Sequence, residues 1–324
     1  MDETNKGTDA PYRCGSCCWS SSRADGWEAP PPTASLIFIY WICESAMNWA
    51  VDGLVLGLVQ GVSEWLPISS KTQIMFASTY LLGLSFGAAY AFGLFLEFAT
   101  LAAAVIYFRR EVWGVLKALA LRGSAEDRLL LKYLVVVTAV TAMVAAPIYL
   151  YFSSISGPVV GLPMIALGLV LIADGLLIKT ARERHTPTKG LTDLRIADLV
   201  LIGVAQGLAA FPGVSRSGIT VSAMLLMGVR PRDAFRLSFL ALIPAALGAS
   251  ALPLLASRRE VLTAASLVSP QGLAVAAVVA TVVSLLLIDA LLKLASSRRI
   301  VPLVVGLGAV AIAGGALGVL IGYG

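Results

Sequence analysis

The stretch Gln60–Gln73, QGVSEWLPISSKTQ, brings a carboxylate, two serines, a lysine and a glutamine into an otherwise apolar part of the chain. A second stretch, Phe211–Thr220, reads FPGVSRSGIT and carries an arginine among hydroxyl groups. Because a residue before proline is pushed out of the helical region, an apolar helix entering either stretch should break there. We therefore predict two helix-loop-helix hairpins, and we call these stretches the first tip and the second tip.

Both tips belong to a repeated unit. The sequence GLVQG at Gly57–Gly61 aligns with GVAQG at Gly203–Gly207, and the alignment continues without gaps through the tips. In each copy one hairpin, 50–84 or 196–228, precedes three long apolar blocks. This internal similarity predicts a duplicated architecture.

The composition is that of a membrane protein. Of the 324 residues, 58% are hydrophobic and 13% are charged, whereas roughly a quarter of the residues in a soluble domain are charged. The mean hydropathy is +0.86, and the apolar blocks are long enough to cross a hydrocarbon core roughly 30 Å thick as helices. We predict an all-α polytopic membrane protein and find no nucleic-acid motif. The blocks are 86–108, 130–152, 158–178, 236–256, 272–293 and 300–323.

The charge distribution predicts the topology. Three crossings per copy would turn the second repeat, 196–324, upside down relative to the first, 47–195, giving an inverted-topology repeat. The opposite face would carry only Arg258 and Arg259, so the basic face is predicted to be cytoplasmic. Two re-entrant hairpins would then enter from opposite sides and meet near the middle of the membrane. The basic loops are 109–132, 179–195, 230–236 and 293–299.

The first 46 residues differ from the rest of the chain. Residues 1–34 are polar and rich in Ser, Pro and Gly, and the apolar run 35–43 is too short to span. We expect a disordered tail, or a segment upstream of a true start at Met47. All four cysteines lie here, but their spacing lacks the second ligand pair of a zinc site.

The second tip has the chemistry of an anion site. Arg216 lies among the hydroxyl groups of Ser215, Ser217 and Thr220, where a new helix should begin. A guanidinium group, hydroxyl groups and the free N–H groups of a helix N-terminus together bind phosphate. Since an arginine within a membrane is costly without a partner, we interpret Arg216 as a phosphate clamp. The alternative is that it only satisfies carbonyl groups of the opposing hairpin.

The first tip supplies an acid. Gln60 and Glu64 are four residues apart and share a helix face, whereas Ala210 stands at the position of Glu64 in the second copy. A single carboxylate facing a phosphate clamp suits phosphoryl chemistry, in which it holds a metal or activates the attacking group. The alternative is that Glu64 is only the counter-ion of Arg216 or of Lys71, a lysine that otherwise could snorkel.

Four other polar residues lie in the apolar parts of the chain. Three of them have two possible roles, and the fourth is interpreted as structural. Ser70 and Gln73 match the S-x-x-Q capping box, so they either cap the returning helix or act directly in the site. Glu97 lies at the centre of its predicted span without a charged neighbour in sequence, so it is either protonated or part of the site. Asp174 is interpreted as the structural partner of Lys179.

The tips resemble the motifs of the undecaprenyl-diphosphate phosphatase family, also called bacitracin-resistance proteins. QGVSEWLPISS matches its first motif, PGVSRSGIT its second, and GVRPRDAFRLSFLALIP (Gly228–Pro244) its following helix, and the resemblance covers Met47–Gly324. It implies an integral plasma-membrane enzyme that removes the terminal phosphate of a polyprenyl diphosphate, a lipid substrate held among membrane lipids, for cell-wall synthesis. It also implies paired re-entrant hairpins with six spanning helices, a pocket that opens outward, and a divalent cation such as Mg²⁺ or Ca²⁺, for which Glu64 is a candidate ligand.

The resemblance also implies roles for individual residues. Glu64 is similar to the essential glutamate and Ser70 to the active-site serine, Gln60 occupies a Glu or Gln position, and Glu97 falls where glutamine is common. The main departure is Gln73, because the family usually has histidine there. Glutamine binds phosphate but relays no proton, and the single histidine, His185, lies in a predicted cytoplasmic loop. The implied phosphate-binding side chains, besides Arg216, are Ser69, Gln73, Ser215, Ser217 and Thr220.

The resulting hypothesis is a membrane pyrophosphatase. Arg216 would clamp the terminal phosphate, and Glu64, with or without a metal, would activate water or Ser70. The rival is a transporter or lipid flippase, for which inverted repeats and broken helices are equally suitable. A flippase, however, needs no general base facing the clamp. A non-catalytic scaffold is a third interpretation, which the complete hydroxyl set of the second tip argues against.

Overall fold

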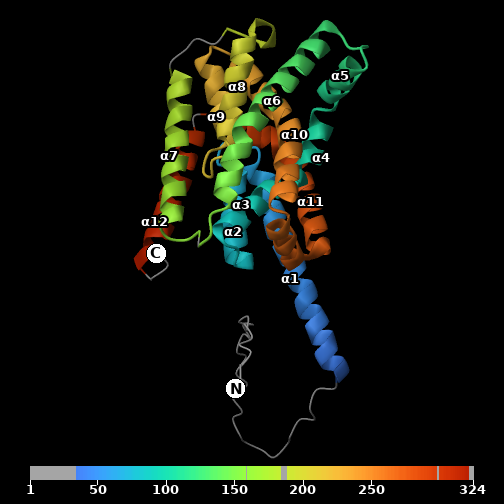
Figure 1. Cartoon of the computed structure of the whole chain (residues 1–324), viewed down its shortest axis with the longest axis vertical. Coiled ribbons are helices and arrows are strands. Elements are labelled where there is room, and N and C mark those ends of the chain that lie inside the picture. Colours follow the sequence, from blue (N-terminus) through green and yellow to red (C-terminus); the bar gives the residue numbers. More distant parts are fainter. Residues whose placement is uncertain (1–33, 158, 184–187, 298, 321–324) are drawn as a thin grey trace, which may run out of the picture. The chain divides into compact units, whose positions relative to one another are not determined.

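The computed structural model describes residues 34–157, 159–183, 188–297 and 299–320 (Figure 1). The chain divides between Cys43 and Glu44 into two units, of which the second contains both tips. Apart from a 3₁₀ turn at Leu191–Asp193, its regular elements are helices. The helices are α1 (Ala34–Ser63), α2 (Ser70–Leu82), α3 (Phe86–Phe95), α4 (Phe98–Tyr107), α5 (Arg109–Leu119), α6 (Ala125–Ser153), α7 (Leu162–Glu183), α8 (Ile196–Leu208), α9 (Arg216–Leu226), α10 (Pro231–Ala256), α11 (Arg258–Ser296) and α12 (Ile300–Leu320).

The predicted N-terminal tail, 1–46, is described only in part. Its residues 34–46 belong to helix α1, and residues 1–33 lie outside the described residues, as does His185. Both predicted repeats lie in the unit that starts at Glu44.

Six helical segments among the described residues are long and apolar enough to cross a membrane. This number confirms the prediction of an all-α polytopic membrane protein. The fifth segment starts at Arg258 instead of 272, because α11 continues through a kink at Ser269, where φ is 69° just before Pro270. Helix α5 lies where a loop, 109–132, was predicted. Hydropathy did not reveal it, because an amphipathic helix has low average hydropathy. The segments are Phe86–Tyr107, Ala125–Ser153, Leu162–Ala181, Pro231–Ala256, Arg258–Ala290 and Val301–Leu320.

Both tips interrupt the helices as their prolines predict. Helix α1 gives way to α2 around Pro67, and α8 gives way to α9 around Pro212. In the first tip Ser69 has a φ of 59°, a left-handed conformation that is costly for a residue other than glycine. Its Oγ lies 2.8 Å from Thr72 Oγ1, and this hydrogen bond helps to hold the turn. Entry of the two hairpins from opposite sides of a membrane stays a prediction.

Small residues let the helices that precede the two tips, α1 and α8, pack closely against helices far away in sequence. Gly57 and Gly61 of α1 face Ala276 and Ala280 of α11, and Ser284 Oγ of α11 donates to Gly61 O at 3.2 Å. Small residues spaced by four allow such close backbone approach in membrane helices. Helix α1 of the first predicted repeat thus packs on α11 of the second predicted repeat.

The second repeat packs in the reciprocal way. Gly203 and Gly207, the repeat counterparts of the two α1 glycines, face Val140 and Val144 of α6. Helices α7 and α12, which occupy the same place in the two repeats, lie along each other (Figure 1). Helix α1 is therefore held by α11 and α8 by α6, which brings the two tips to the same region of the unit.

Substituting alanine for Gly57 should destabilise the fold. A Cβ atom at Gly57 would lie 2.7 Å from the carbonyl oxygen of Ala276, and a backbone atom can yield only if α1 and α11 separate. We expect Gly57→Ala to lower the free energy of unfolding by about 1–3 kcal/mol, measured by circular dichroism in detergent. Gly248 of α10 has no atom within 4 Å of such a Cβ, so Gly248→Ala should be neutral or stabilising. Equal losses in both variants would contradict the close packing of α1 on α11.

The basic segments meet at one end of the unit. Arg236 Nη2 of α10 lies 3.0 Å from Glu111 Oε1 of α5, and Arg230 N donates to Lys189 O, in the connection between α7 and α8, at 3.0 Å. Segments that are far apart in sequence but share a basic character are therefore neighbours. The positive-inside rule predicts such clustering of charge on one face.

Candidate active site

The two tips contact each other directly. Gly213 N of the second tip donates to Thr72 Oγ1 of the first at 2.9 Å. Lys71 Nζ donates in the opposite direction, to Val214 O, at 2.7 Å. Lys71 is 4% exposed, so the proposed snorkelling of its side chain is wrong. These bonds fix each tip against the other and hold a buried ammonium group between them.

Arg216 lies between two carboxylates. Its Nη2 forms an ion pair with Glu64 Oε1, and its Nη1 lies 3.6 Å from Glu97 Oε2. Gln60 Nε2 donates to the second oxygen of Glu64, Oε2, at 2.7 Å, which orients that carboxylate. The side chains of Glu64 and Arg216 are 1% and 14% exposed. A buried ion pair adds little to stability once desolvation is counted, so its presence favours a functional role.

Glu97 reaches Arg216 because its helix is broken. Helix α3 ends at Phe95 and α4 begins at Phe98, so Glu97 lies in the turn between them, inside the first membrane-spanning segment. It is 7% exposed. Of its two interpretations, the structure supports a place in the site: its carboxylate approaches Nη1 of the guanidinium, whereas Glu64 pairs with Nη2.

The start of α9 is ordered by a buried acid from α7. Ser215 is the N-cap, and its Oγ accepts from Gly218 N at 3.2 Å. Ser215 N donates to Asp174 Oδ2 at 3.2 Å, and a carboxylate is favoured near the positive end of a helix. The pairing of Asp174 with Lys179 is wrong, since no ion pair joins them among the described residues and Lys179 is exposed. The sequence did show that Asp174 is an acid inside an apolar span, and this feature could have suggested that it binds a polar group of another helix.

A small cavity lies among Arg216, the two glutamates and the start of α9. Its volume is about 10 Å³, roughly the space for one water molecule. The structure thus brings together most of the predicted site residues, and adds Lys71. The lining residues are Glu64, Leu66, Ser69, Ser70, Lys71, Glu97, Ser215, Arg216 and Ser217.

Thr220 and Gln73 do not line this cavity. Thr220 Oγ1 lies 2.6 Å from Ser238 Oγ of α10 and donates to Arg216 O at 2.7 Å, so it anchors the first turn of α9. Gln73 Nε2 donates to Ile68 O at 3.0 Å. The capping-box alternative is wrong, because the N-cap of α2 is Ser69, which forms no side-chain capping bond. Both residues support the tips from outside the cavity.

The bond from Gln73 to the first tip predicts a structural effect. We expect Gln73→Ala to lower the free energy of unfolding by about 1 kcal/mol, because Ile68 O loses its donor. Gln73→His keeps an N–H donor and should lose less. Thermal unfolding in detergent and phosphate release measured on the same samples separate the roles. Unchanged stability with abolished release would instead place Gln73 in the reaction.

A second, apolar cavity of about 350 Å³ adjoins the first. Lys71, Glu97 and Arg216 line both cavities, so the polar cluster stands at one end of an apolar space. Most of its other walls are Ala and Leu side chains of α3, α6 and α10, such as Leu94 and Leu252. Such a space suits an amphiphile with an anionic head and an apolar tail.

The oxygen atoms of the cluster fit a hard divalent cation. Glu64 and Glu97 supply carboxylates, and Gln60 Oε1 is buried without a hydrogen-bond partner. No group of three or more His, Cys, Asp or Glu residues arranged to hold a metal occurs in the part of the chain that the structure describes. One or two carboxylates are nevertheless the usual protein share of a Mg²⁺ site, because phosphate oxygens and water complete the coordination.

Comparisons with known proteins cover this whole region. The family model described as bacitracin resistance protein BacA matches residues 53–313. An undecaprenyl-diphosphatase of Saccharolobus solfataricus is 53% identical over 272 residues, which are 84% of this chain and 97% of that protein. One of Saccharolobus islandicus is 54% identical over 260 residues, 80% of this chain and 93% of its own. One of Pyrobaculum aerophilum is 43% identical over 268 residues, 82% of this chain and 97% of its own.

Proposed function

The chain belongs to the bacitracin resistance protein BacA family, and from this we infer that it is an integral membrane phosphatase. It hydrolyses undecaprenyl diphosphate to the monophosphate and phosphate, the activity that the names of its relatives state. This reaction recycles a lipid carrier for cell-envelope polysaccharides. The flippase alternative is not favoured, since these relatives are named as diphosphatases. The observation that carries the site is the buried Arg216 between Glu64 and Glu97.

Substrate binding follows from the two adjoining cavities. The terminal phosphate takes the place next to Arg216, where Ser215 and Ser217 add hydroxyl groups. A phosphate is larger than the polar cavity of about 10 Å³, so Arg216 must exchange part of its pairing with Glu64 for the phosphate. The first units of the prenyl chain enter the apolar cavity, and the rest of the chain stays among membrane lipids.

Release from Arg216 leaves the Glu64 carboxylate able to accept a proton. In the hydrolytic step, Glu64 takes a proton from the attacking group, which is either water or the Ser70 hydroxyl. The oxygen of that group attacks the terminal phosphorus. The bond from that phosphorus to the bridging oxygen breaks, and the prenyl monophosphate leaves with the electron pair. If Ser70 attacks, water then hydrolyses the phosphoserine. Gln60 keeps the Glu64 carboxylate oriented through its 2.7 Å hydrogen bond.

A divalent cation such as Mg²⁺ or Ca²⁺ fits the same donor set. Glu64 and Glu97 would hold it, together with the substrate and water. When bound, such a cation neutralises charge on the diphosphate. Lys71, which is buried at the junction of the two cavities, contributes positive charge from the protein itself.

The orientation in the membrane follows from the basic end. We assign this end to the cytoplasm and the site opening to the outer side of the plasma membrane, with the hairpins re-entering from opposite faces. Single cysteines at Ser156, after α6, and at Arg122, before α6, would test this in cells, in a background where the native cysteines are replaced by serine. A membrane-impermeant thiol reagent should label Ser156→Cys and not Arg122→Cys. The reverse pattern would overturn the orientation.

The activity itself is tested on purified protein in detergent. We expect one phosphate to be released from each undecaprenyl diphosphate and none from undecaprenyl monophosphate. Lipid phosphate that crosses reconstituted vesicles without hydrolysis would overturn the phosphatase and support the flippase.

A further inference from the structure

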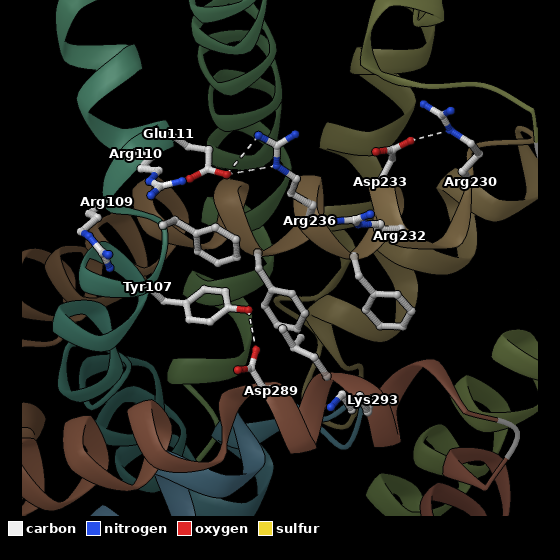
Figure 2. Close-up of a pocket in the computed structure, with 14 residues that line it drawn as sticks. Tyr107, Arg109, Arg110, Glu111, Arg230, Arg232, Asp233, Arg236, Asp289 and Lys293 are labelled. Atoms are coloured by element: carbon white, nitrogen blue, oxygen red, sulfur yellow. Dashed lines mark hydrogen bonds and ion pairs between the residues drawn. The ribbon is translucent and has the colours of Figure 1, made fainter.

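A wide cavity opens at the basic end of the unit, apart from the two tips (Figure 2). Its volume is about 1240 Å³, and segments of α4, α5, α10 and α11 line it. The lining contains six basic side chains and only three acidic ones. The basic side chains are Arg109, Arg110, Arg230, Arg232, Arg236 and Lys293.

Two of the acids are already paired with arginines, one in α10 and one at its N-cap. Arg236 Nη2 lies 3.0 Å from Glu111 Oε1, and Arg230 Nε lies 2.7 Å from Asp233 Oδ2. Figure 2 shows both pairs in the upper part of the view, away from Asp289 and Lys293. These contacts consume two acids and leave most of the positive charge in place.

Two further arginines of the lining, Arg110 and Arg232, form no ion pair among the described residues. Both are exposed, and they come from different helices, α5 and α10. The third acid, Asp289 of α11, accepts a hydrogen bond from Tyr107 Oη at 2.8 Å. The lining therefore offers guanidinium groups from two directions to an anion that the protein does not itself supply.

The helix directions add to this positive charge. Helix α10 begins at Pro231, so its N-terminus lies at the cavity, whereas the N-terminus of α5 at Arg109 is offset by the C-terminus of α4 at Tyr107. Helix N-termini carry partial positive charge and free N–H groups, which favour phosphate.

The base of the cavity is apolar. It is formed by Phe108, Phe235, Phe239 and Leu292, which belong to or adjoin membrane-spanning segments. Orientation by the positive-inside rule requires only basic loops and no such cavity. A free phosphate ion would gain no binding energy from aromatic side chains at the bottom of the cavity. A lipid, in contrast, presents an anionic head next to an apolar body.

We propose that this basic cavity binds the phosphate headgroup of an anionic membrane lipid at the cytoplasmic end of the protein. Arg110 and Arg232 contact the phosphate, and the aromatic base receives the start of the lipid chains. Basic pockets between membrane helices commonly hold such headgroups. The site is separate from the diphosphatase site and does not depend on the mechanism proposed for it.

The test compares two double variants of the full chain. Arg110→Gln with Arg232→Gln removes two arginines of the cavity, and Arg122→Gln with Arg195→Gln removes two exposed arginines from basic loops outside it. Binding of phosphatidic acid, phosphatidylcholine and inorganic phosphate is measured by native mass spectrometry. We expect the cavity variant to bind phosphatidic acid more weakly, on the order of fivefold for each arginine removed, with the control unchanged.

Several outcomes would overturn the proposal. Equal weakening in both double variants would show only general surface charge, and equal binding of phosphatidylcholine would remove the need for an anionic head. Competition by inorganic phosphate for the same site would make it a free-phosphate site. If the cavity double variant does not fold, Arg232→Gln alone decides by its expected fivefold loss. Phosphate release from undecaprenyl diphosphate in detergent should be equal in both variants, so failure here leaves the phosphatase assignment untouched.

Discussion

Replacing Arg216 by alanine will lower phosphate release from undecaprenyl diphosphate by about 10³-fold, because Arg216 is the one arginine among the described residues that line the cavity proposed for the terminal phosphate. The loss should appear mainly in turnover, since the charge on the phosphoryl oxygens is stabilised most in the transition state. Steady-state phosphate release on purified protein measures it. Arg216→Lys keeps the charge but not the planar fork of the guanidinium. Its activity should therefore lie between that of the unchanged protein and that of Arg216→Ala.

The Arg216→Ala variant also leaves Glu64 and Glu97 without their shared guanidinium partner. Breaking a buried ion pair can cost about 3–5 kcal/mol of stability, so each sample must first be shown to be folded by size exclusion and circular dichroism. Arg258→Ala, at the opposite end of the unit from the basic cavity, serves as a control for loss of one charge. A folded Arg216→Ala enzyme with wild-type turnover would remove Arg216 from the phosphate site.

Replacing Glu64 by glutamine will lower turnover by about 10²–10⁴-fold, the usual contribution of a general base. Glutamine keeps the size of the side chain but can no longer accept the proton of the attacking group. Because this proton moves only during the reaction, the KM should change less than kcat.

Glu97→Gln is the matched control, because it removes the carboxylate that lies 3.6 Å from the other terminal nitrogen, Nη1, of the same guanidinium. Its loss should be smaller, since Glu97 lies farther from the guanidinium than Glu64, which forms the closer ion pair, and no proton transfer is assigned to it. Equal losses in Glu64→Gln and Glu97→Gln would mean that the site needs only charge balance around Arg216. The role of Glu64 as the base would then be wrong.

Much of the fold was predictable because the relevant signals are local. Runs of apolar residues marked the six spanning segments, and Pro67 and Pro212 marked both helix breaks. Helix α5 and the start of α11 were missed, because average hydropathy does not detect an amphipathic helix or one that continues through a kink at Pro270.

Candidate residues of the site were predictable by type but not by role. Glu64, Ser70 and Arg216 were selected because polar groups are costly in an apolar chain, and all three line one cavity. Gln73 satisfied the same criterion, yet its side chain binds the backbone of Ile68. A residue type and its spacing do not specify which of several acceptors a flexible side chain will reach.

Apolar blocks, broken helices and a repeated motif are properties of neighbouring residues, so the membrane class and the chemistry of the tips could be inferred from the chain alone. The partners of the charged groups were decided by packing. Asp174 pairs with Ser215 N and not with Lys179, and Lys71 is buried against Val214. These contacts exist only because α1 packs against α11 and α8 packs against α6, an arrangement that depends on the close approach of helices far apart in sequence.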